Sequence, residues 1–323
     1  MQNKKAISVG IDVSKESLDV AVLFGDESNL IKPFDNSKQG LKILVGWLNQ
    51  QGVTRSTPCV IESTGDFHLP SAITLTNNKF TVNVINPIIT KQYQRATVRD
   101  AKTDKIDALR LARIGIMEQG LKPFIADLNG ITARKLLSEI SLLERMKQQY
   151  VANTNRFMKT KEALGLTVGC VSGKKLIKQL DQRITTLYRE VQRLAPEQAK
   201  KFARQTPGLS ERQMSVVAAA LSGARFTDRD QVTAFVGLDI RKRESGTWKG
   251  RERISKRGNP FVRKILFQIG WSLKQHNPVY QDYYNKLHSE GKHYFTCILA
   301  VARKFLRFLF ACYLNLNQTP TMA

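Results

Sequence analysis

The feature that most limits how this chain can fold is a change of pattern near residue 104. Before this point, short apolar runs of strand length alternate with helical patterns. After it, apolar residues recur at three- and four-residue spacing, and no strand-like run follows for about ninety residues. The 323 residues are enough for about two domains with real cores. We therefore expect an α/β region followed by an all-α region.

The first region predicts a mixed sheet. Apolar, β-branched runs occupy residues 7–11, 18–24, 30–34, 59–61 and 82–85. One helical pattern separates the third run from the fourth, and another separates the fourth from the fifth. Three strands in a meander, followed by strands that alternate with helices, are typical of a ribonuclease H type sheet.

The middle of the chain predicts helices only. Thr103 stands at an N-cap position before a helical stripe that continues to Met117. Residues 130–164 and 173–194 predict a long helical hairpin. Its apolar stripes need a surface to cover them, either on a partner subunit or on the chain's own domains.

The final third is expected to be mainly helical as well. Helices are predicted over 211–221, over 261–276 and after Pro278, with a Gly- and Arg-rich loop at 239–258. The expected domains are residues 1–122, 123–200 and 201–323.

The chain carries a large excess of positive charge. It has 51 Lys and Arg against 27 Asp and Glu, a net charge of +24, and ten of the cations lie within residues 241–264 beside only two acids. Such a charge repels itself unless a polyanion neutralises it. Nucleic acids are the commonest intracellular polyanions, and acidic membrane surfaces come second.

Nothing in the sequence predicts secretion, a disulfide framework or a membrane span. Four cysteines without C-x-x-C spacing fit a reducing cytosol. The most apolar stretch, 295–316, is interrupted by Arg303, Lys304 and Arg307, which predicts a packed amphipathic helix. We expect a cytoplasmic, nucleoid-associated protein that does not bind membranes.

Four acids are expected to converge at one edge of the predicted sheet. Asp12 follows the first strand, Glu62 follows the fourth, and Asp104 and Asp107 lie at i and i+3 on one helix face. Grouped carboxylates repel one another unless a cation compensates them. Oxygen ligands without His or Cys select Mg²⁺ or Mn²⁺, and two such ions can clamp the attacking and leaving oxygens of a phosphodiester.

Each acid also has a plainer interpretation. An Asp after a strand is commonly a cap or turn residue, and Asp104 and Asp107 would be favoured near the positive end of a helix dipole. For any single acid, a structural role of this kind explains the residue better than metal binding does. For all four acids together it explains them less well, because all four are expected at the same edge of the sheet. His68, six residues after Glu62, is better explained by packing or capping than by chemistry.

Residues 241–259 combine Ser245-Gly246 with three glycines and a dense set of cations. Glycines let the backbone approach a phosphate, and arginine binds it bidentately. Because no Asp–His pair accompanies Ser245, a protease-like triad is disfavoured. The Ser245 hydroxyl could attack phosphorus among these cations, or the loop could only grip the DNA backbone, and the residues alone do not separate the two. The expected nucleic-acid ligands are Arg241, Lys242, Arg243, Lys249, Arg251, Arg253, Lys256, Arg257, Arg263 and Lys264.

Five short motifs carry a resemblance that covers nearly the whole chain. They are Gly-Ile-Asp-Val-Ser-Lys at 10–15, Ile-Glu-Ser-Thr-Gly at 61–65, Lys-Thr-Asp-Lys-Ile-Asp-Ala at 102–108, Arg-Glu-Ser-Gly at 243–246 and Ile-Ser-Lys-Arg-Gly-Asn at 254–259. The first three resemble the acidic motifs, and the last two the C-terminal signature, of the DEDD-type transposases of bacterial insertion sequences. That family includes the Piv-type DNA invertases and is known for RNA-guided recombination.

The resemblance implies more than the residues alone do. It implies a RuvC-like domain in which Asp12, Glu62, Asp104 and Asp107 bind Mg²⁺, and a C-terminal domain whose Ser245 becomes joined covalently to DNA. It also implies a homo-oligomer, a dimer or tetramer, in which the acids of one subunit meet the serine of another. A structured bridge RNA would pair with both donor and target double-stranded DNA, and the helical hairpin would serve dimerisation and RNA contact.

The chain departs from the family pattern at two places. Ser210 stands where the family commonly has a second glycine after Pro207-Gly208, which affects phosphate binding by that turn. The stretch 237–240 lacks the proline that commonly precedes the serine loop, which affects the loop's entry angle. The favoured function is a Mg²⁺-dependent, serine-nucleophile recombinase. The alternatives are a metal-only RuvC-like junction nuclease and a Piv-type invertase that acts by inversion instead of insertion, while a non-catalytic nucleic-acid-binding protein is disfavoured by the acids.

Overall fold

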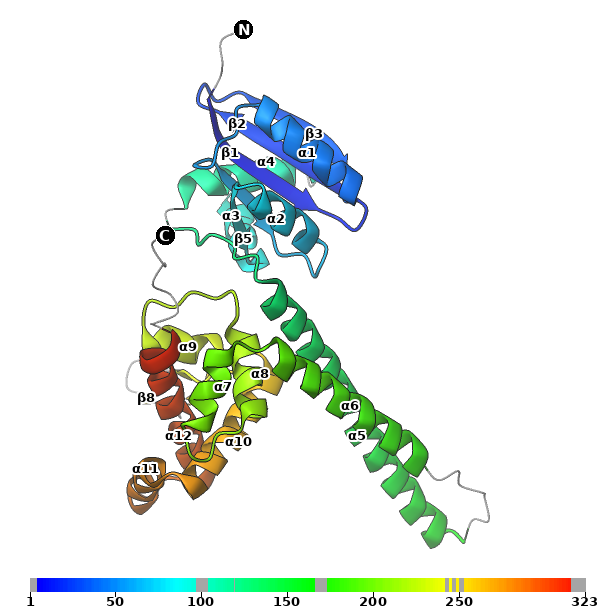
Figure 1. Ribbon diagram of the computed structural model, residues 1–323, viewed down its shortest axis with the longest axis vertical. Coiled ribbons are helices and arrows are strands. Elements are labelled where there is room, and N and C mark those ends of the chain that lie inside the picture. Colours follow the sequence, from blue (N-terminus) through cyan, green and yellow to red (C-terminus); the bar gives the residue numbers. More distant parts are fainter. Residues whose placement is uncertain are drawn as a thin grey trace. The chain divides into compact units, whose positions relative to one another are not determined.

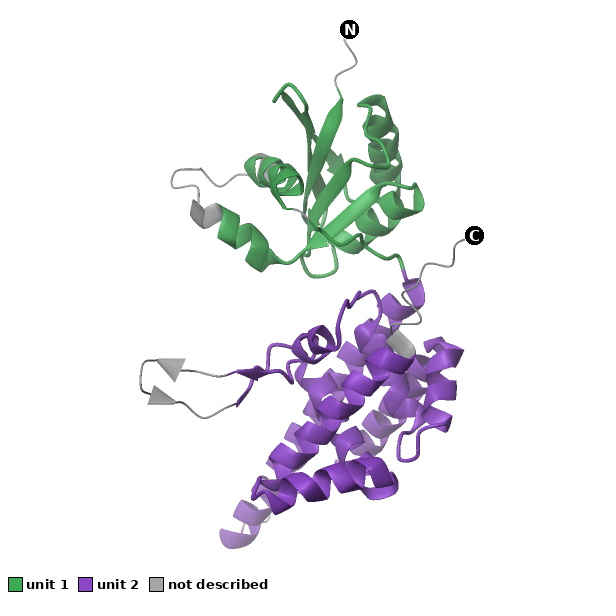
Figure 2. Ribbon diagram, turned by 90° about the vertical axis from the view of Figure 1, so that its left-hand side faces the viewer, with its two compact units in different colours: residues 1–126 green, residues 127–323 purple. Residues whose placement is uncertain are grey.

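The computed structural model of the protein divides into two compact units, residues 1–126 and 127–323 (Figure 2). The structure describes residues 5–96, 104–118, 120–165, 173–241, 244–245, 248–249 and 253–314. Within these ranges the side chains of 94–96, 104–105, 244–245, 248–249 and 313–314 are not described. Each unit has its own hydrophobic core, so each is considered by itself.

Unit 1 is built on a five-stranded mixed sheet with the order β3-β2-β1-β4-β5 (Figure 1). The strands are β1 (Ala6–Val13), β2 (Ser17–Phe24), β3 (Asn29–Asp35), β4 (Pro58–Glu62) and β5 (Thr81–Ile85). The first three are antiparallel, while β4 is parallel to both β1 and β5. All five strands lie where the apolar runs predict them, and β1 and β4 are neighbours that end at the same edge.

Helices cover both faces of this sheet. On one face, α1 (Lys38–Gln50) and α2 (His68–Asn77) bury Leu44 and Leu75 against the odd-numbered residues of β1. On the other face, α4 (Asp104–Met117) packs Leu111 and Ile114 against Val60 of β4, and α3 (Pro87–Ala96) lies beside it. Successive residues of β4 are therefore buried in two different layers, Cys59 and Ile61 against one face of the sheet and Val60 against the other.

Unit 2 contains the predicted hairpin, formed by α5 (Leu128–Ala163) and α6 (Lys174–Leu194). Its remaining helices are α7 (Glu197–Arg204), α8 (Glu211–Leu221), α9 (Arg229–Phe235), α10 (Pro260–His276), α11 (Pro278–Ser289), α12 (Tyr294–Leu309) and a π-helical turn at Phe310–Leu314. One core joins α8, α10 and α12 to the near half of the hairpin. The apolar stretch 295–316 supplies the buried face of α12, as predicted, and no described helix is both long and apolar enough to cross a membrane.

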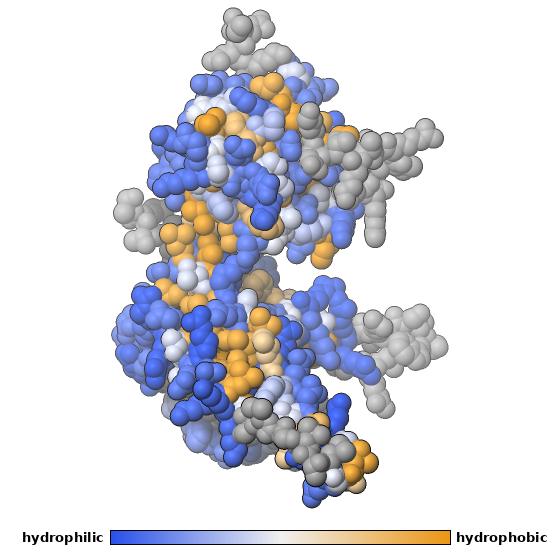
Figure 3. Space-filling view, turned by 90° about the vertical axis from the view of Figure 1, so that its right-hand side faces the viewer, coloured by the Kyte–Doolittle hydropathy of each residue, from blue (hydrophilic) through white to orange (hydrophobic). Residues whose placement is uncertain are grey.

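The two halves of the hairpin differ in burial. Ile140 of α5 and Ile184 of α6 belong to the core of unit 2, so this part of the apolar stripe is covered by the chain itself. Figure 3 shows apolar residues in patches between hydrophilic ones on the side of the unit that carries the hairpin. The large apolar side chains exposed along the hairpin are Leu128, Leu142, Met146, Phe157, Met158, Leu164 and Leu176, and all except Leu128 lie after Ile140 and before Ile184.

The structure adds short elements that the sequence patterns do not predict. The loop expected at 239–258 contains two small ladders, one between β6 (Ile240–Arg241) and β9 (Arg253–Ile254), the other between β7 (Glu244–Ser245) and β8 (Trp248–Lys249). Strands of two residues are too short for an alternating pattern to be visible. The helices α7 and α9 have only eight and seven residues, which is too short for a clear helical period, so they are not predicted either. Thr103, the expected cap of α4, lies outside the described residues.

Candidate active site

Asp12 and Glu62 lie side by side at the carboxyl edge of the sheet of unit 1. The parallel ladder between β1 and β4 ends with the pair Ile11 and Ile61, and each acid is the next residue on its strand. Both side chains are half-buried. The Val13 backbone N–H donates to Asp12 Oδ1 at 3.0 Å, and Asp12 has a further interaction. The topology therefore brings these two predicted site residues to one edge.

The helix α4 is pressed directly onto the strand that carries Asp12. A Cβ on Gly10 would lie 2.0 Å from the Ala108 carbonyl oxygen, and one on Gly115 would lie 2.4 Å from Ser8 Oγ. Only glycine permits such a close approach between helix and strand. Because Asp107 immediately precedes Ala108, these contacts hold its segment of α4 above β1.

Asp107 forms an ion pair with Arg110 one turn along α4, and both side chains are largely buried, with 17% and 12% exposed. Asp104 is the first residue of the same helix, and its side chain lies outside the described set. Among the side chains that are described, no three His, Cys, Asp or Glu residues form a group that could hold a metal ion. The available donors are carboxylate oxygens, which suit Mg²⁺ or Mn²⁺ and not a softer metal.

His68 packs in unit 1 at the first position of α2, with 8% of its surface exposed. Its Nδ1 is buried and has no hydrogen-bond partner among the described residues. Burial lowers the pKa of its imidazole below the usual 6.5, and a hydrogen bond with the Thr64 backbone opposes this effect. The ring therefore favours its neutral form, in keeping with the packing role expected from the sequence.

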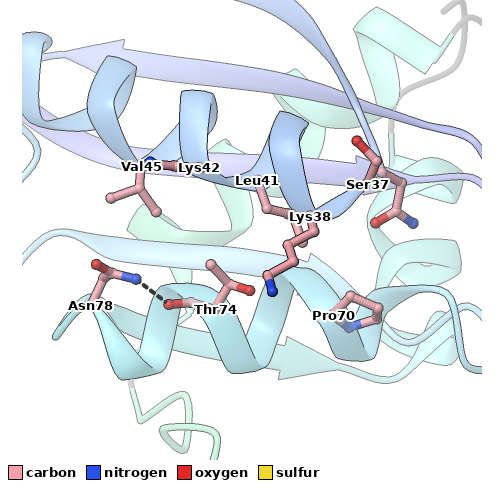
Figure 4. A pocket seen from close by; sticks show the side chains of 9 residues that line it. Ser37, Lys38, Leu41, Lys42, Val45, Pro70, Thr74 and Asn78 are labelled. Atoms are coloured by element: carbon pink, nitrogen blue, oxygen red, sulfur yellow. Dashed lines mark hydrogen bonds between the residues drawn. The ribbon is translucent and has the colours of Figure 1, made fainter.

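A groove of about 520 Å³ runs between α1 and α2 on the opposite side of the sheet from α4 (Figure 4). It is lined by Asn36, Ser37, Lys38, Leu41, Lys42, Val45, Pro70, Thr74 and Asn78. In Figure 4 the Lys38 side chain extends from α1 toward Thr74 of α2. No pattern in the sequence indicates this groove, because two lysines one helical turn apart are common on exposed helix faces.

Ser245 belongs to unit 2, on the short strand β7, where it pairs with Trp248 of β8. The segment that carries it leaves and re-enters the unit through the β6–β9 ladder, which pairs Ile240 with Ile254. The backbone of Ser245 is described but its side chain is not. The structure thus gives the serine's place in a β-hairpin arrangement, without contacts of its hydroxyl.

The base of this segment, by contrast, is closely packed. Gly237 has a φ of +73°, and a Cβ there would lie 2.6 Å from the Gly258 nitrogen. The Ser255 hydroxyl donates to the Asp239 carboxylate, and the Ser255 N–H donates to the Asp239 carbonyl at 2.9 Å. Asp239 stands next to the position where the proline is missing, so a side-chain hydrogen bond fixes the entry to the loop here.

The predicted nucleic-acid ligands have different surroundings. Arg241 and Arg253 face each other across the β6–β9 ladder, where two like charges are unfavourable without an anion.

Arg263 donates to the carbonyls of Gly258 and Val236, and burial lowers its pKa. Lys264 Nζ lies 2.6 Å from Glu144 Oε2 of α5. Two further cations, Lys256 and Arg257, are exposed. The other four cannot be placed in the same way: the side chain of Lys249 is not described, and outside the described residues lie Lys242, Arg243 and Arg251.

The turn at Pro207-Gly208 serves the packing of unit 2. Gly208 has a φ of +85°, and a Cβ there would lie 2.9 Å from the Ser272 carbonyl oxygen of α10. Ser210, which replaces the expected glycine, forms a capping box with Gln213 at the start of α8. The departure from the family pattern thus has a local structural reason.

Comparison with known proteins places this architecture among enzymes that rearrange DNA. A transposase family model matches residues 9–164, and the model of the transposase IS116/IS110/IS902 family matches residues 200–285. The chain is also similar to the pilin gene-inverting proteins of Moraxella bovis, 25% identical, and Moraxella lacunata, 24% identical, each over 94% of both chains.

The protein is therefore an enzyme of the DNA recombinase and transposase class. Within that class it belongs to the IS116/IS110/IS902 family of transposases, together with the Piv-type invertases. The first match covers unit 1 and continues along α5 of unit 2, the second lies wholly within unit 2, and both agree with the resemblance seen in the acidic and serine-loop motifs.

Proposed function

We propose that the protein is a site-specific DNA recombinase whose unit 1 holds Mg²⁺ or Mn²⁺ and whose Ser245 is the nucleophile. The observation that carries the proposal is the adjacency of Asp12 and Glu62 at the ends of two parallel strands, with the helix of Asp107 packed directly on Gly10. The strand order, three antiparallel strands followed by two parallel ones, supports a RuvC-like, ribonuclease H type domain.

The residues that would hold the metal are Asp12, Glu62, Asp104 and Asp107. When bound there, the ion would supply Lewis-acid activation of the scissile phosphodiester. Arg110 accompanies Asp107 and offsets its charge. The half-buried setting of Asp12 and Glu62 strengthens their repulsion, so a cation is the natural complement of this edge.

Ser245 would act by direct attack on phosphorus. A bond forms between its Oγ and the phosphorus, the bond to the leaving nucleotide oxygen breaks, and the serine proton ends on the departing hydroxyl. The hydroxyl of a second DNA end reverses the reaction and releases the serine. Because the phosphodiester energy is retained in the phosphoserine, rejoining needs no ATP.

The cations around Ser245 support binding of the DNA backbone. Arg241 and Arg253 are held opposite each other by the β6–β9 ladder, and a phosphate between two such guanidiniums would relieve their repulsion. Lys256 and Arg257 add exposed charge just after the returning strand β9. Arg263 and Lys264 have protein partners, so we assign them to the support of the loop and not to phosphate.

The proposed partners are donor and target DNA, a structured bridge RNA and further copies of the chain, acting in the bacterial cytoplasm on the nucleoid. The exposed apolar residues of the outer hairpin support its use in self-association. The net charge of +24 supports binding of more than one nucleic acid.

A second candidate reaction is inversion of a DNA segment instead of insertion. The observation that favours it is the similarity to pilin gene-inverting proteins over 94% of the chain. Both reactions need the same cleavage and rejoining chemistry, so the outcome depends on how the DNA ends are arranged.

The test is a trapping experiment with DNA, Mg²⁺ and denaturing gels. We expect the native protein and a Ser289→Ala control to form covalent protein–DNA adducts, and Ser245→Ala and Asp12→Asn to form none. Adducts that persist in Ser245→Ala would remove the serine from the mechanism. Cleavage with free ends, no adducts and indifference to Ser245 would instead identify a metal-only junction nuclease.

A further inference from the structure

Asn36 stands at a junction of three loops at the carboxyl edge of the unit 1 sheet. It lies between Asp35, the last residue of β3, and Ser37, the N-cap of α1. The turn is tight, because a Cβ on Gly40 would lie 2.2 Å from the Asp35 carbonyl oxygen. The Ser37 side chain accepts a hydrogen bond from the Gly40 N–H at 3.1 Å. Asn36 is therefore held firmly at the start of α1.

The side chain of Asn36 joins the two loops that follow the acid-bearing strands. Its Nδ2 donates to the Ser14 carbonyl at 2.9 Å and to the Phe67 carbonyl at 3.1 Å. Ser14 is two residues after Asp12, and Phe67 is five residues after Glu62. The Asn36 backbone N–H adds a bond to the Glu16 carbonyl at 2.9 Å.

This bridge begins where the sheet stops connecting the two strands. The parallel pairing between β1 and β4 ends at Ile11 and Ile61, one residue before the acids. Among the described hydrogen bonds beyond that pair, those of Asn36 link the loop after Asp12 to the loop after Glu62. The turn after Asp12 is itself fixed, since the Ser14 hydroxyl accepts from the Ser17 N–H at 2.9 Å.

Asparagine has the chemistry that this place requires. Both acceptors are carbonyl oxygens, and a primary amide supplies two N–H donors from one nitrogen. Aspartate has the same shape but offers no donor when ionised. The Oδ1 of Asn36 is buried and has no hydrogen-bond partner among the described residues, so the two donated bonds are what the side chain contributes.

We propose that Asn36 is a positioning residue that fixes the separation of the Asp12 and Glu62 carboxylates and thereby the affinity of the edge for a divalent cation. The inference rests on the proposed role of these two acids. Groups that hold ligands in place from behind typically change metal affinity by 10–100-fold when they are removed.

The test compares Asn36→Leu and Asn36→Asp with matched changes at Asn78. Asn78 Nδ2 also donates to a backbone carbonyl, that of Thr74 at 2.8 Å, in the same unit but within one helix end. We expect both Asn36 variants to accelerate amide hydrogen exchange in the loops 14–17 and 63–67 together, and the Asn78 variants to leave these loops unchanged. Unchanged exchange in Asn36→Leu and Asn36→Asp would overturn the bridge, whatever the protein's function.

Metal binding is then measured on the full-length protein with Mn²⁺ by titration calorimetry. We expect Asn36→Leu to weaken Mn²⁺ binding at least about tenfold and the Asn78 variants to have no effect. If Asn36→Leu does not fold, Asn36→Asp serves in its place. Faster exchange with unchanged Mn²⁺ affinity would show a merely structural bridge and overturn the proposal. Failure of the proposed function is separate and visible, because Asp12→Asn would then leave Mn²⁺ binding intact.

Discussion

The two candidate parts of the active site are built in opposite ways. Asp12 and Glu62 end strands of a five-stranded sheet that is covered on both faces, so their positions follow from core packing. Ser245 lies on a strand of two residues, beyond a ladder of equal length, and its position depends on the base of its hairpin. The proposed metal-holding edge is thus joined directly to the core of unit 1, whereas Ser245 lies on a short hairpin beyond the core of unit 2.

This difference fits the separate tasks that we propose for the two parts. Carboxylates that share a cation must keep a fixed spacing, since a small displacement removes a ligand. A nucleophile that reacts with one DNA end and later releases it to another needs access more than enclosure. The contrast in construction should therefore have measurable consequences for stability and for activity.

The largest effect is expected from Gly10→Ala in unit 1. The added Cβ would meet the Ala108 carbonyl oxygen at 2.0 Å and the Ala112 nitrogen at 2.3 Å, both backbone atoms that cannot turn aside. We expect a loss of about 3 kcal/mol in the free energy of unfolding, measured by circular dichroism in urea. Gly46→Ala is the control, because nothing lies within 4 Å of its Cβ and α1 should gain stability.

The next effect concerns the base of the serine segment. Gly237 and Gly291 have similar φ values, +73° and +78°, but a Cβ on Gly237 meets Gly258 and Arg257 while one on Gly291 meets nothing within 4 Å. We expect Gly291→Ala to cost about 1 kcal/mol and Gly237→Ala about 2 kcal/mol. Gly237→Ala should in addition abolish covalent adduct formation while the metal affinity of unit 1 is unchanged. Equal adduct yields in the two variants would contradict the role of the base.

A smaller effect is expected at the helix caps of both units. Ser37 caps α1 and Ser210 caps α8, each through its hydroxyl and a backbone N–H. Replacement of either serine by alanine should cost about 1 kcal/mol, and replacement by glycine only a few tenths. Thermal unfolding of the four variants would check these values. A loss much above about 1 kcal/mol for Ser37→Ala would mean that the cap also stabilises the hydrogen bonds of Asn36.

The smallest effect is a pH dependence of unit 1 through His68. Burial lowers its pKa in the folded state, so the unfolded state binds more protons as the pH falls below about 6.5. Stability should therefore be complete above that pH and decrease as the pH falls. His68→Asn should remove this part of the acid destabilisation in urea titrations at several pH values.

Sequence patterns predict the sheet well because its strands are apolar runs of five to eight residues bounded by turns. They also predict that Asp12 and Glu62 meet, since parallel neighbours end at one edge. The Asn36 bridge was not predicted, because a single asparagine in a turn between a strand and a helix looks like any other turn residue. The sequence also does not predict that Arg263 and Lys264 have protein partners. Their acceptors, the Gly258 carbonyl and the Glu144 carboxylate, come close to them only in the folded chain.

The anchoring of the hairpin has a mechanical consequence. Glu144 of α5 accepts a hydrogen bond from Tyr188 of α6, whose ring lies 3.5 Å from the Arg212 guanidinium, and Glu144 is also paired with Lys264 of α10. With 36 residues, α5 is a rod roughly 54 Å long. A force applied at the outer end of α5 would turn the helix about this cluster, as a lever turns about its fulcrum. The cluster would pass the resulting torque to α10, the helix that begins directly after the serine segment.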